Sequence, residues 1–303
     1  MSSFENLVFE GGGVKGSAYA GCIQILAEQG LYDQVKRVAG TSAGSITATL
    51  LALGAGSDGL TESVLDTDFN QFVYDRGGWI MDIWRVFRHY GIHSGNSFVK
   101  ILKDYLKKYV NDPNLTFAEL EKKRIKEPHI FKHLTVVGSN ITTQKSDIFD
   151  CVRTPNIPIW EAVRCSMSIP VVFEPYKINN NYYVDGGLGW IYPIDIYDTK
   201  KLDGEDIRNP NTLGFYLEPS SQKGLKPPKS DIHSLKTAAE AMIGFLFDNS
   251  NSKHLHPGDR QRSVFIDDLG VSSTNFDISK EEIQKLIDSG RKATEAYLKN
   301  RIA

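Results

Sequence analysis

Short strand-like runs alternate with longer helical patterns over the first fifty residues of the chain. Residues 7–9 are apolar and end in glycines, and residues 36–39 lead into another glycine, so both predict short strands. Residues 14–29 repeat apolar side chains every three to four positions, and residues 42–53 are rich in small and apolar side chains, so both predict helices. This strand–helix–strand–helix order predicts a parallel sheet with helices packed on it.

The segment from about residue 66 to residue 130 has a different composition: it is rich in aromatic side chains and is interrupted by glycines. It predicts two or three helices joined by loops, and we expect it to form a helical, lid-like insertion. One stripe within it recurs at helical spacing: Trp79, Ile80, Ile83, Trp84 and Phe87. The stripe fits either packing against the core or a lid that touches a membrane interface.

The remaining elements alternate in the same way. A helix over 115–126 is expected to begin with a capping box, because Glu119 follows Thr116 by three positions. Strands at 171–173 and 181–184 are expected to flank a turn at 179–180. Further strands are expected at 133–138, 213–217 and 263–266, and further helices at 159–167, 232–248 and 279–301. We predict one α/β domain over residues 1–303, with a central, mostly parallel sheet sandwiched by helices in three layers and residues from about 200 to 303 completing the fold.

Composition narrows the class of protein. With 35 Lys and Arg against 37 Asp and Glu, the formal net charge is −2, so we expect no nucleic-acid partner. Three cysteines without regular spacing argue against a disulfide framework or a zinc site. No signal-peptide pattern and no run of 18 apolar residues occurs. We therefore expect a cytoplasmic protein, with export by a route that needs no signal peptide left open.

The second predicted strand leads into the pattern Gly-x-Ser-x-Gly, with Ser42 between Gly40 and Gly44. Glycines on both sides allow a sharp turn that presents the serine hydroxyl at the start of a helix, where backbone amides favour developing negative charge. Ser42 is therefore a candidate nucleophile. A tight turn with a capping serine is the alternative explanation.

The first predicted strand ends in Gly11, Gly12 and Gly13, followed by Lys15 and Gly16. Amides that no side chain covers can bind an oxyanion, so this loop is a candidate oxyanion hole. The alternatives are a packing turn and a nucleotide-binding turn. A phosphate-binding loop is excluded because no Gly-Lys-Ser/Thr follows, and no acidic residue ends a second strand as ribose binding requires. Lys15 adds a cation suited to a substrate phosphate or carboxylate.

A nucleophilic serine needs a base. Of the seven histidines, His233, His254 and His256 follow Ser42 in the chain order of an ordinary α/β-hydrolase, but none comes directly after a predicted strand. They stay as alternative bases.

A carboxylate has a more suitable place. Asp185 ends an apolar strand and is followed by Gly186 and Gly187, which holds its side chain at a sheet edge. A partly desolvated aspartate within about 3 Å can take a proton directly from a serine. A simple β-turn is the alternative explanation.

In their order along the chain, residues 11–16, 40–44 and 185–187 resemble the three signature blocks of patatin-like phospholipases. A fourth block, residues 164–173, is similar to the family's Ala-Ser-x-x-x-Pro-x-x-Phe, with Cys165 in place of alanine. The resemblance spans roughly residues 5 to 195.

The resemblance implies a patatin-like fold and a Ser–Asp dyad without a catalytic histidine, in which Ser42 is the nucleophile and Asp185 the base. It also implies that the Gly12–Gly13 backbone forms the oxyanion hole. Lys15 matches the basic position that follows the family's glycines. The other motif glycines are Gly11, Gly16, Gly40, Gly44, Gly186 and Gly187.

The expected function is that of a lipid acyl hydrolase of the phospholipase A or lysophospholipase type, acting on membrane phospholipids at a peripheral membrane contact. Lys15 would then contact the substrate's phosphate. A His-dependent esterase on soluble esters and a lipid-binding module that a partner activates are the alternatives. We expect no cofactor and no metal, since no acidic loop has the spacing of a calcium site. Dependence on an activating protein or small molecule stays open.

Overall fold

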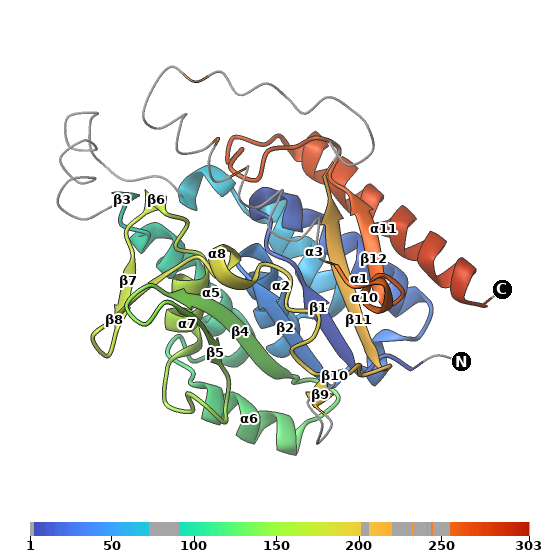
Figure 1. Cartoon of the computed structure of the whole chain (residues 1–303), viewed down its shortest axis with the longest axis horizontal. Helices are drawn as coiled ribbons and strands as arrows, with labels where there is room; N and C mark the ends of the chain where they lie inside the picture. Colours follow the sequence, from blue (N-terminus) through green and yellow to red (C-terminus); the bar gives the residue numbers. More distant parts are fainter. Residues whose placement is uncertain are drawn as a thin grey trace.

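The computed structural model describes residues 3–72, 91–200, 206–219, 232, 241, 244 and 255–302. Within these residues an eight-stranded sheet forms the centre of the molecule (Figure 1). Five of its strands are parallel, in the order β12–β11–β1–β2–β4. In that order their bounds are Ser263–Asp267, Thr212–Glu218, Asn6–Phe9, Arg37–Thr41 and His133–Asn140. The mixed, mostly parallel sheet confirms the predicted α/β fold class.

Three antiparallel strands extend the sheet at β4. β5 and β8 pair with β4, and β7 pairs with β8. Two smaller sheets join β3 to β6 and β9 to β10. The bounds of these strands are Gly91–His93 (β3), Lys145–Phe149 (β5), Val171–Phe173 (β6), Tyr176–Ile178 (β7), Asn181–Val184 (β8), Thr199–Lys200 (β9) and Asp206–Ile207 (β10).

The hairpin before the predicted base differs from the expectation. Its first strand is β7 and not residues 171–173, which pair with β3 instead. Asn179 and Asn180 have φ values of 46° and 67°, so they form a two-residue turn directly after Ile178. Turns of this kind match the twist of the strands that they join.

The helices of the described residues pack on both sides of the sheet. Figure 1 shows α1, α2 and α3 behind the strands and the short helix α8 in front of them. Among the longer helices, the bounds are Ala18–Glu28 (α1), Ala43–Ala52 (α2), Gly56–Asp66 (α3), Asn96–Val110 (α5), Phe117–Lys126 (α6), Ile159–Ser166 (α7) and Lys280–Ile302 (α11). Shorter ones are α8 (Gly187–Trp190), α10 (Pro257–Arg260) and the 3-10 turns η1 (Gly13–Ser17), η2 (Tyr32–Gln34) and η3 (Phe69–Phe72).

Most predicted elements are confirmed to within a few residues. The capping box of α6 is present: Thr116 Oγ1 accepts from the amide of Glu119, whose carboxylate accepts from the amide of Thr116. The helix expected from residue 14 begins instead as the tighter turn η1. Among the elements that were not predicted are α3, which buries only Leu60 and Ser63, and β5, in which only Phe149 is buried. Neither carries a clear hydrophobic period.

Only part of the segment predicted to be a lid-like insertion is described. α5 packs on α7, and its buried residues Phe98, Leu102 and Leu106 belong to the main hydrophobic core. The aromatic stripe from Trp79 to Phe87 lies outside the described residues, as does almost all of the helix expected at 232–248. No helix within the described part of the chain is both long and apolar enough to cross a membrane.

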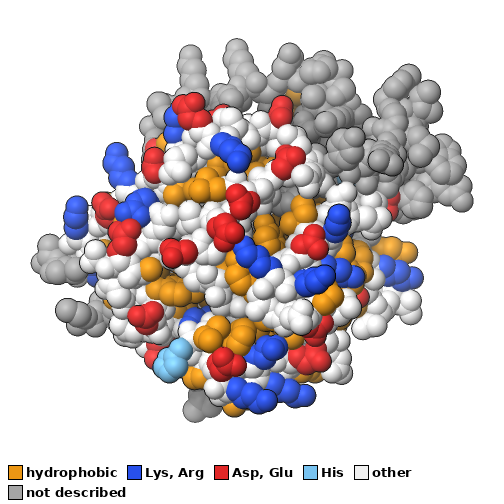
Figure 2. Space-filling view, turned by 180° about the vertical axis from the view of Figure 1, so that it is seen from behind, with side chains coloured by type: hydrophobic (Ala, Val, Ile, Leu, Met, Phe, Trp, Pro, Cys, Tyr) orange, Lys and Arg blue, Asp and Glu red, His pale blue; other side chains and the backbone are white. Residues whose placement is uncertain are grey.

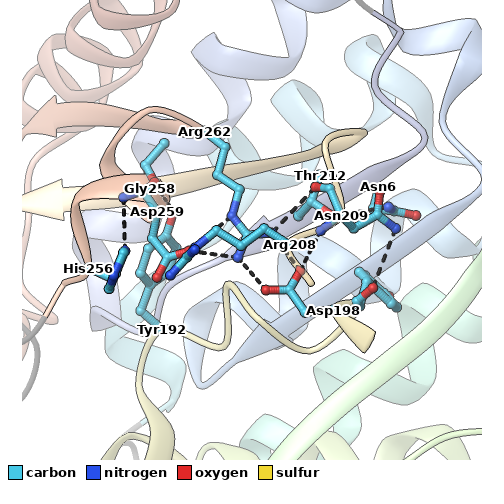
Figure 3. A network of polar contacts seen from close by, with 12 residues as sticks. Asn6, Tyr192, Asp198, Arg208, Asn209, Thr212, His256, Gly258, Asp259 and Arg262 are labelled. Atoms are coloured by element: carbon cyan, nitrogen blue, oxygen red, sulfur yellow. Dashed lines mark hydrogen bonds and ion pairs between the residues drawn. The ribbon is translucent and has the colours of Figure 1, made fainter. Parts of the chain in front are cut away.

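A buried ion-pair network holds the amino ends of β11 and β12 (Figure 3). Arg262, next to the start of β12, donates to both oxygens of Asp198 at 2.6 Å and to Asp259 at 2.7 Å. Asp198 also accepts from the amide of Asn209, just before β11. The network therefore joins the segment that follows α8 to β11 and β12, the two strands of the sheet that come last along the chain.

The face seen from behind carries both signs of charge. Lys and Arg side chains alternate there with Asp and Glu, and apolar side chains lie between them (Figure 2). No single-sign field covers the coloured part of this face, as the small net charge leads one to expect.

Candidate active site

Two strands meet end to end along one edge of β4. Thr41, the last residue of β2, pairs with Val137, and Val184, the last residue of β8, pairs with Ser139. β5 pairs with the same residues of β4 and so takes the opposite edge. β2 runs parallel to β4 and β8 antiparallel to it, so their carboxyl ends point at each other. Only Gly138 of β4 separates the two pairings.

Ser42 follows β2 at a sharp elbow. Its φ and ψ values are 52° and −126°, a strained conformation for a residue with a side chain. The flanking glycines are required by close approach: a Cβ on Gly40 would overlap the backbone of Gly44, and a Cβ on Gly44 would overlap the carbonyl of Phe9. α2 can therefore begin at once and pack against β1 and β2, which places Ser42 just before the amino end of a helix.

The hydroxyl of Ser42 donates a hydrogen bond of 2.6 Å to Oδ2 of Asp185. The other carboxylate oxygen accepts from the amide of Gly187 at 2.7 Å, and both side chains of the pair are fully buried. Burial raises the pKa of Asp185 to about 7, although the hydrogen bonds from Ser42 and Gly187 oppose the shift. The carboxylate is thus a stronger base than an exposed aspartate and lies in contact with the proton that it would remove.

Residues at the end of α7 hold both members of this pair. Ser166 Oγ accepts from the amide of Ser42 at 2.8 Å and donates to the carbonyl of Val137 at 2.6 Å. The amide of Asp185 donates to the carbonyl of Ser168. The sequence analysis included Ser166 and Ser168 in the motif block at residues 164–173 but predicted no function for either. The only feature that could have indicated one is that two serines follow the apolar residues of a predicted helix.

Arg164 anchors the same block from within the core. The residue is 2% exposed, and its guanidinium donates to the hydroxyl of Ser168 and to the carbonyls of Ser94 and Glu174. It therefore links the block to the residues that lead into α5. No sequence signal marked Arg164 as buried.

The glycine loop lies beside Ser42. β1 and β2 are neighbours, and a Cβ on Gly11 would be 3.1 Å from that of Ser42. The amide of Gly11 donates to the carbonyl of Ile191, whereas no hydrogen bond among the described residues occupies the amides of Gly12 and Gly13. Those two amides are available to an oxyanion. Gly16 packs against Ala43, and Gly186 packs against the carbonyl of Val137.

Lys15 has an intramolecular partner. Its side chain is buried, and Nζ lies 3.2 Å from Oδ2 of Asp268, in the turn after β12. A contact between Lys15 and a substrate phosphate stays a prediction.

The histidines offer no comparable base in the described part of the chain. His256 caps α10, where its Nδ1 accepts from the amide of Gly258 (Figure 3). His233 and His254 lie outside the described residues.

One cluster has metal-ligand chemistry, at the amino end of β4 and away from Ser42. Nδ1 of His133 lies 3.5 Å from Glu121 and 3.7 Å from the sulfur of Cys151. Arg124 donates to both carboxylate oxygens of Glu121 at 2.9 and 2.6 Å. The guanidinium of Arg124 already neutralises the negative charge of Glu121, which a metal ion would otherwise have to neutralise. We therefore interpret the cluster as an ion-paired network.

A narrow, largely apolar cavity begins at the glycine loop and Ala43, next to Ser42. It runs between α2, α3 and α5, and its apolar lining includes Ile46, Leu50, Leu60, Val64 and Phe98. A second cavity under α5 shares Ile46, Leu50 and Tyr105 with the first. A chain of methylene groups attached to a carbonyl at Ser42 would find apolar surface along this path.

The chain is similar to known proteins along most of its length. The chain is 28% identical over 311 residues to the protein YqhO of Bacillus subtilis, a match that covers 96% of this chain and 97% of YqhO. It is 30% identical over 201 residues to the probable lipid hydrolase 463L of Invertebrate iridescent virus 6, covering 65% of this chain and 66% of the viral protein. The chain thus spans just under two thirds of the viral relative.

Among solved structures, VipD of Legionella pneumophila superposes with a TM-score of 0.64 at 19% identity, covering 98% of this chain and 67% of VipD. A likeness at that identity establishes the fold. The family model for patatin-like phospholipases matches residues 7–197, which contain the glycine loop, Ser42, the block at 164–173 and Asp185. The chain belongs to the patatin-like phospholipase family.

Proposed function

We propose that this protein hydrolyses the fatty-acyl esters of membrane phospholipids, as a phospholipase A or lysophospholipase. The observation that carries the proposal is the 2.6 Å hydrogen bond from Ser42 Oγ to a buried Asp185, beside the unoccupied amides of Gly12 and Gly13. A nucleophile, a base and oxyanion donors at one point are the parts that acyl transfer needs.

In the first half of the reaction, Ser42 Oγ attacks the ester carbonyl carbon while its proton passes to Oδ2 of Asp185. The carbonyl oxygen becomes negatively charged and is bound by the amides of Gly12 and Gly13. The ester C–O bond then breaks, and the protonated Asp185 returns the proton to the leaving alcohol. The products of this half are an acyl-Ser42 ester and an alcohol, here a lysophospholipid or a glycerophosphodiester.

In the second half, water takes the place of the alcohol. Asp185 accepts a proton from the water as its oxygen attacks the acyl carbonyl, and the same two amides bind the oxyanion. The bond from the acyl carbon to Ser42 Oγ breaks, and the proton moves from Asp185 to that oxygen. The fatty acid leaves, and the dyad returns to its starting state.

The surroundings of the dyad support a lipid substrate over a small soluble ester. The apolar cavity that starts at Ala43 can receive an acyl chain. Leu188 and Leu269 are each 47% exposed; Leu188 follows Asp185 by three positions, and Leu269 follows Asp268, the partner of Lys15. Exposed apolar side chains next to these residues suit a peripheral contact with a phospholipid surface. The name of the viral relative, a probable lipid hydrolase, points to the same substrate class.

The test is to incubate the full chain with vesicles of mixed phospholipids and to identify released fatty acids and lysolipids by mass spectrometry. Ser42→Ala and Asp185→Asn should release neither, and the matched control Ser57→Ala, at a half-buried serine of α3, should act like the wild type. Release that depends on His256 and occurs only from soluble esters would support a His-dependent esterase. No turnover, together with a Ser42 that no fluorophosphonate labels, would support a lipid-binding module.

A further inference from the structure

Two segments that lie far apart in the sequence meet at the glycine loop. Lys15, two residues after Gly13, reaches Asp268, 253 positions later, with Nζ 3.2 Å from Oδ2. Each side chain of the pair is 5% exposed. Two opposite charges held out of water attract each other strongly, so separating them is costly. The pair is therefore a firm connection between the loop and the turn that follows β12.

A second contact joins the same two segments. The carbonyl of Ser273 accepts from the amide of Val14 at 3.2 Å. The same carbonyl lies so close to Gly13 that a Cβ there would overlap it. Gly13 also has a φ of 57°, which a residue with a side chain adopts at a cost. The segment 268–273 thus forms one wall of the loop that carries the two unoccupied amides.

The turn that carries Asp268 is itself held in place. Oδ1 of Asp268 accepts from the amide of Gly270 at 2.9 Å, and the amide of Asp268 donates to the carbonyl of Glu218 at the end of β11. Leu269 and Gly270 have φ values of 55° and 72°, which reverse the chain directly after Asp268. One carboxylate oxygen therefore fixes the turn and the other holds Lys15.

We propose that Asp268 is a positioning residue for the oxyanion hole: through Lys15 it keeps the Gly12–Gly13 amides in the shape that binds the oxyanion. The proposal rests on the function proposed above. It assigns a role to a residue beyond the matched family region, residues 7–197. It also gives Lys15 an internal role in place of the contact with a substrate phosphate.

The two roles of Lys15 make opposite predictions. If Lys15 binds phosphate, Lys15→Met should harm only phosphate-bearing substrates, and Asp268→Asn should not lower turnover, because it removes a carboxylate that competes with the phosphate for the ammonium. If the pair positions the loop, both variants should lose activity alike on a phospholipid and on a neutral ester. A displaced oxyanion donor costs about 10- to 1,000-fold in kcat.

The experiment measures kcat and KM of the full chain on dioleoylphosphatidylcholine vesicles and on p-nitrophenyl butanoate. We expect Lys15→Met and Asp268→Asn to lower kcat by about 10- to 100-fold on both substrates with little change in KM. Lys15→Arg, which keeps the charge, should restore most of the rate. The matched control Asp267→Asn, whose carboxylate accepts from the amide of Leu269, should stay near the wild type. Asp268→Asn with an unchanged kcat, or a loss confined to the phospholipid, would overturn the proposal.

A second readout does not depend on turnover. Hydrogen–deuterium exchange of the amides at residues 11–16 should be faster in Asp268→Asn than in the wild type or in Asp267→Asn. If the wild type cleaves neither substrate, the proposed function fails, and the exchange rates alone decide the positioning role. Equal exchange in all three proteins would then overturn it. If Asp268→Asn does not fold, Lys15→Met against Lys15→Arg gives the same comparison.

Discussion

Ser42 Oγ lies 2.6 Å from Asp185 Oδ2 because the strands before these residues approach each other along a single edge of β4. β2 delivers Ser42 from one direction and β8 delivers Asp185 from the other. Shifting either strand by one residue would turn its side chains to the opposite face of the sheet. The geometry of the dyad is therefore set by the register of β2 and β8 on β4.

The first prediction concerns the pH dependence of catalysis. Asp185 must be ionised to accept the proton of Ser42, and its pKa is raised to about 7. We expect kcat/KM to rise about tenfold per pH unit below 7 and to level off above about 8, since kcat/KM reports the free enzyme. The measurement is a pH profile on a neutral ester. A profile that levels off by pH 5 would show that a group of ordinary carboxylate pKa, or none, controls the step.

The second prediction concerns stability. The folded protein holds a proton on Asp185 up to about pH 7, whereas the unfolded chain releases it near 3.8. This contribution to stability is present below about pH 4 and is lost as the pH rises through 7. The uncharged Asn side chain of Asp185→Asn escapes that loss, so its Tm relative to the wild type should be higher at pH 8 than at pH 5. A Tm difference that is the same at both pH values would contradict the raised pKa.

The third prediction concerns Ser166, which bridges the amide of Ser42 and the carbonyl of Val137. Ser166→Ala leaves two buried polar groups without this partner, so we expect a loss of about 1–3 kcal/mol in the free energy of unfolding. The elbow should also shift, lowering kcat by about 10- to 100-fold. Urea denaturation and ester kinetics measure the two effects. Thr294→Val, at a buried hydroxyl in α11, is the control that should lose stability and keep its kcat.

The fourth prediction concerns acyl-chain length. Ile46 lines both the apolar cavity that begins beside Ser42 and the second cavity under α5, so a larger side chain there should narrow the path between them. Ile46→Trp should lower kcat/KM for esters of 16 carbons by about 10- to 100-fold relative to esters of four, because each methylene kept out of an apolar site costs about 0.8 kcal/mol. A series of p-nitrophenyl esters measures the ratio. Equal losses at every chain length would place the acyl chain elsewhere.

Local patterns predicted most of the elements, and together with the family resemblance they predicted that Ser42 and Asp185 form a pair. Strands such as β1 and β2 have short apolar runs that glycines end, and the capping box at Thr116 is a local device. The strand β7 was not predicted, although the two-residue turn at Asn179 and Asn180 pairs it directly with β8. Hairpin register depends on turn geometry that single residues suggest only weakly.

Apart from the contact between Ser42 and Asp185, contacts between distant parts of the chain could not be predicted. Nothing near Lys15 indicates that its partner lies 253 positions away, and nothing near Ser166 indicates that its hydroxyl supports Ser42. Both depend on how the sheet brings its strand ends together. Sequence patterns and the family resemblance therefore predicted the residues proposed to react, and the tertiary fold was needed to find the residues that hold them.

The most direct test of the central claim is the rate at which a fluorophosphonate labels Ser42. Wild-type protein, Asp185→Asn, Ser42→Ala and the control Ser57→Ala are compared by intact-protein mass spectrometry, with circular dichroism to show that each is folded. We expect rapid single labelling of the wild type and of Ser57→Ala, labelling slowed by about 100-fold or more in Asp185→Asn, and none in Ser42→Ala. Labelling of folded Asp185→Asn at the wild-type rate would contradict the claim that Asp185 activates Ser42.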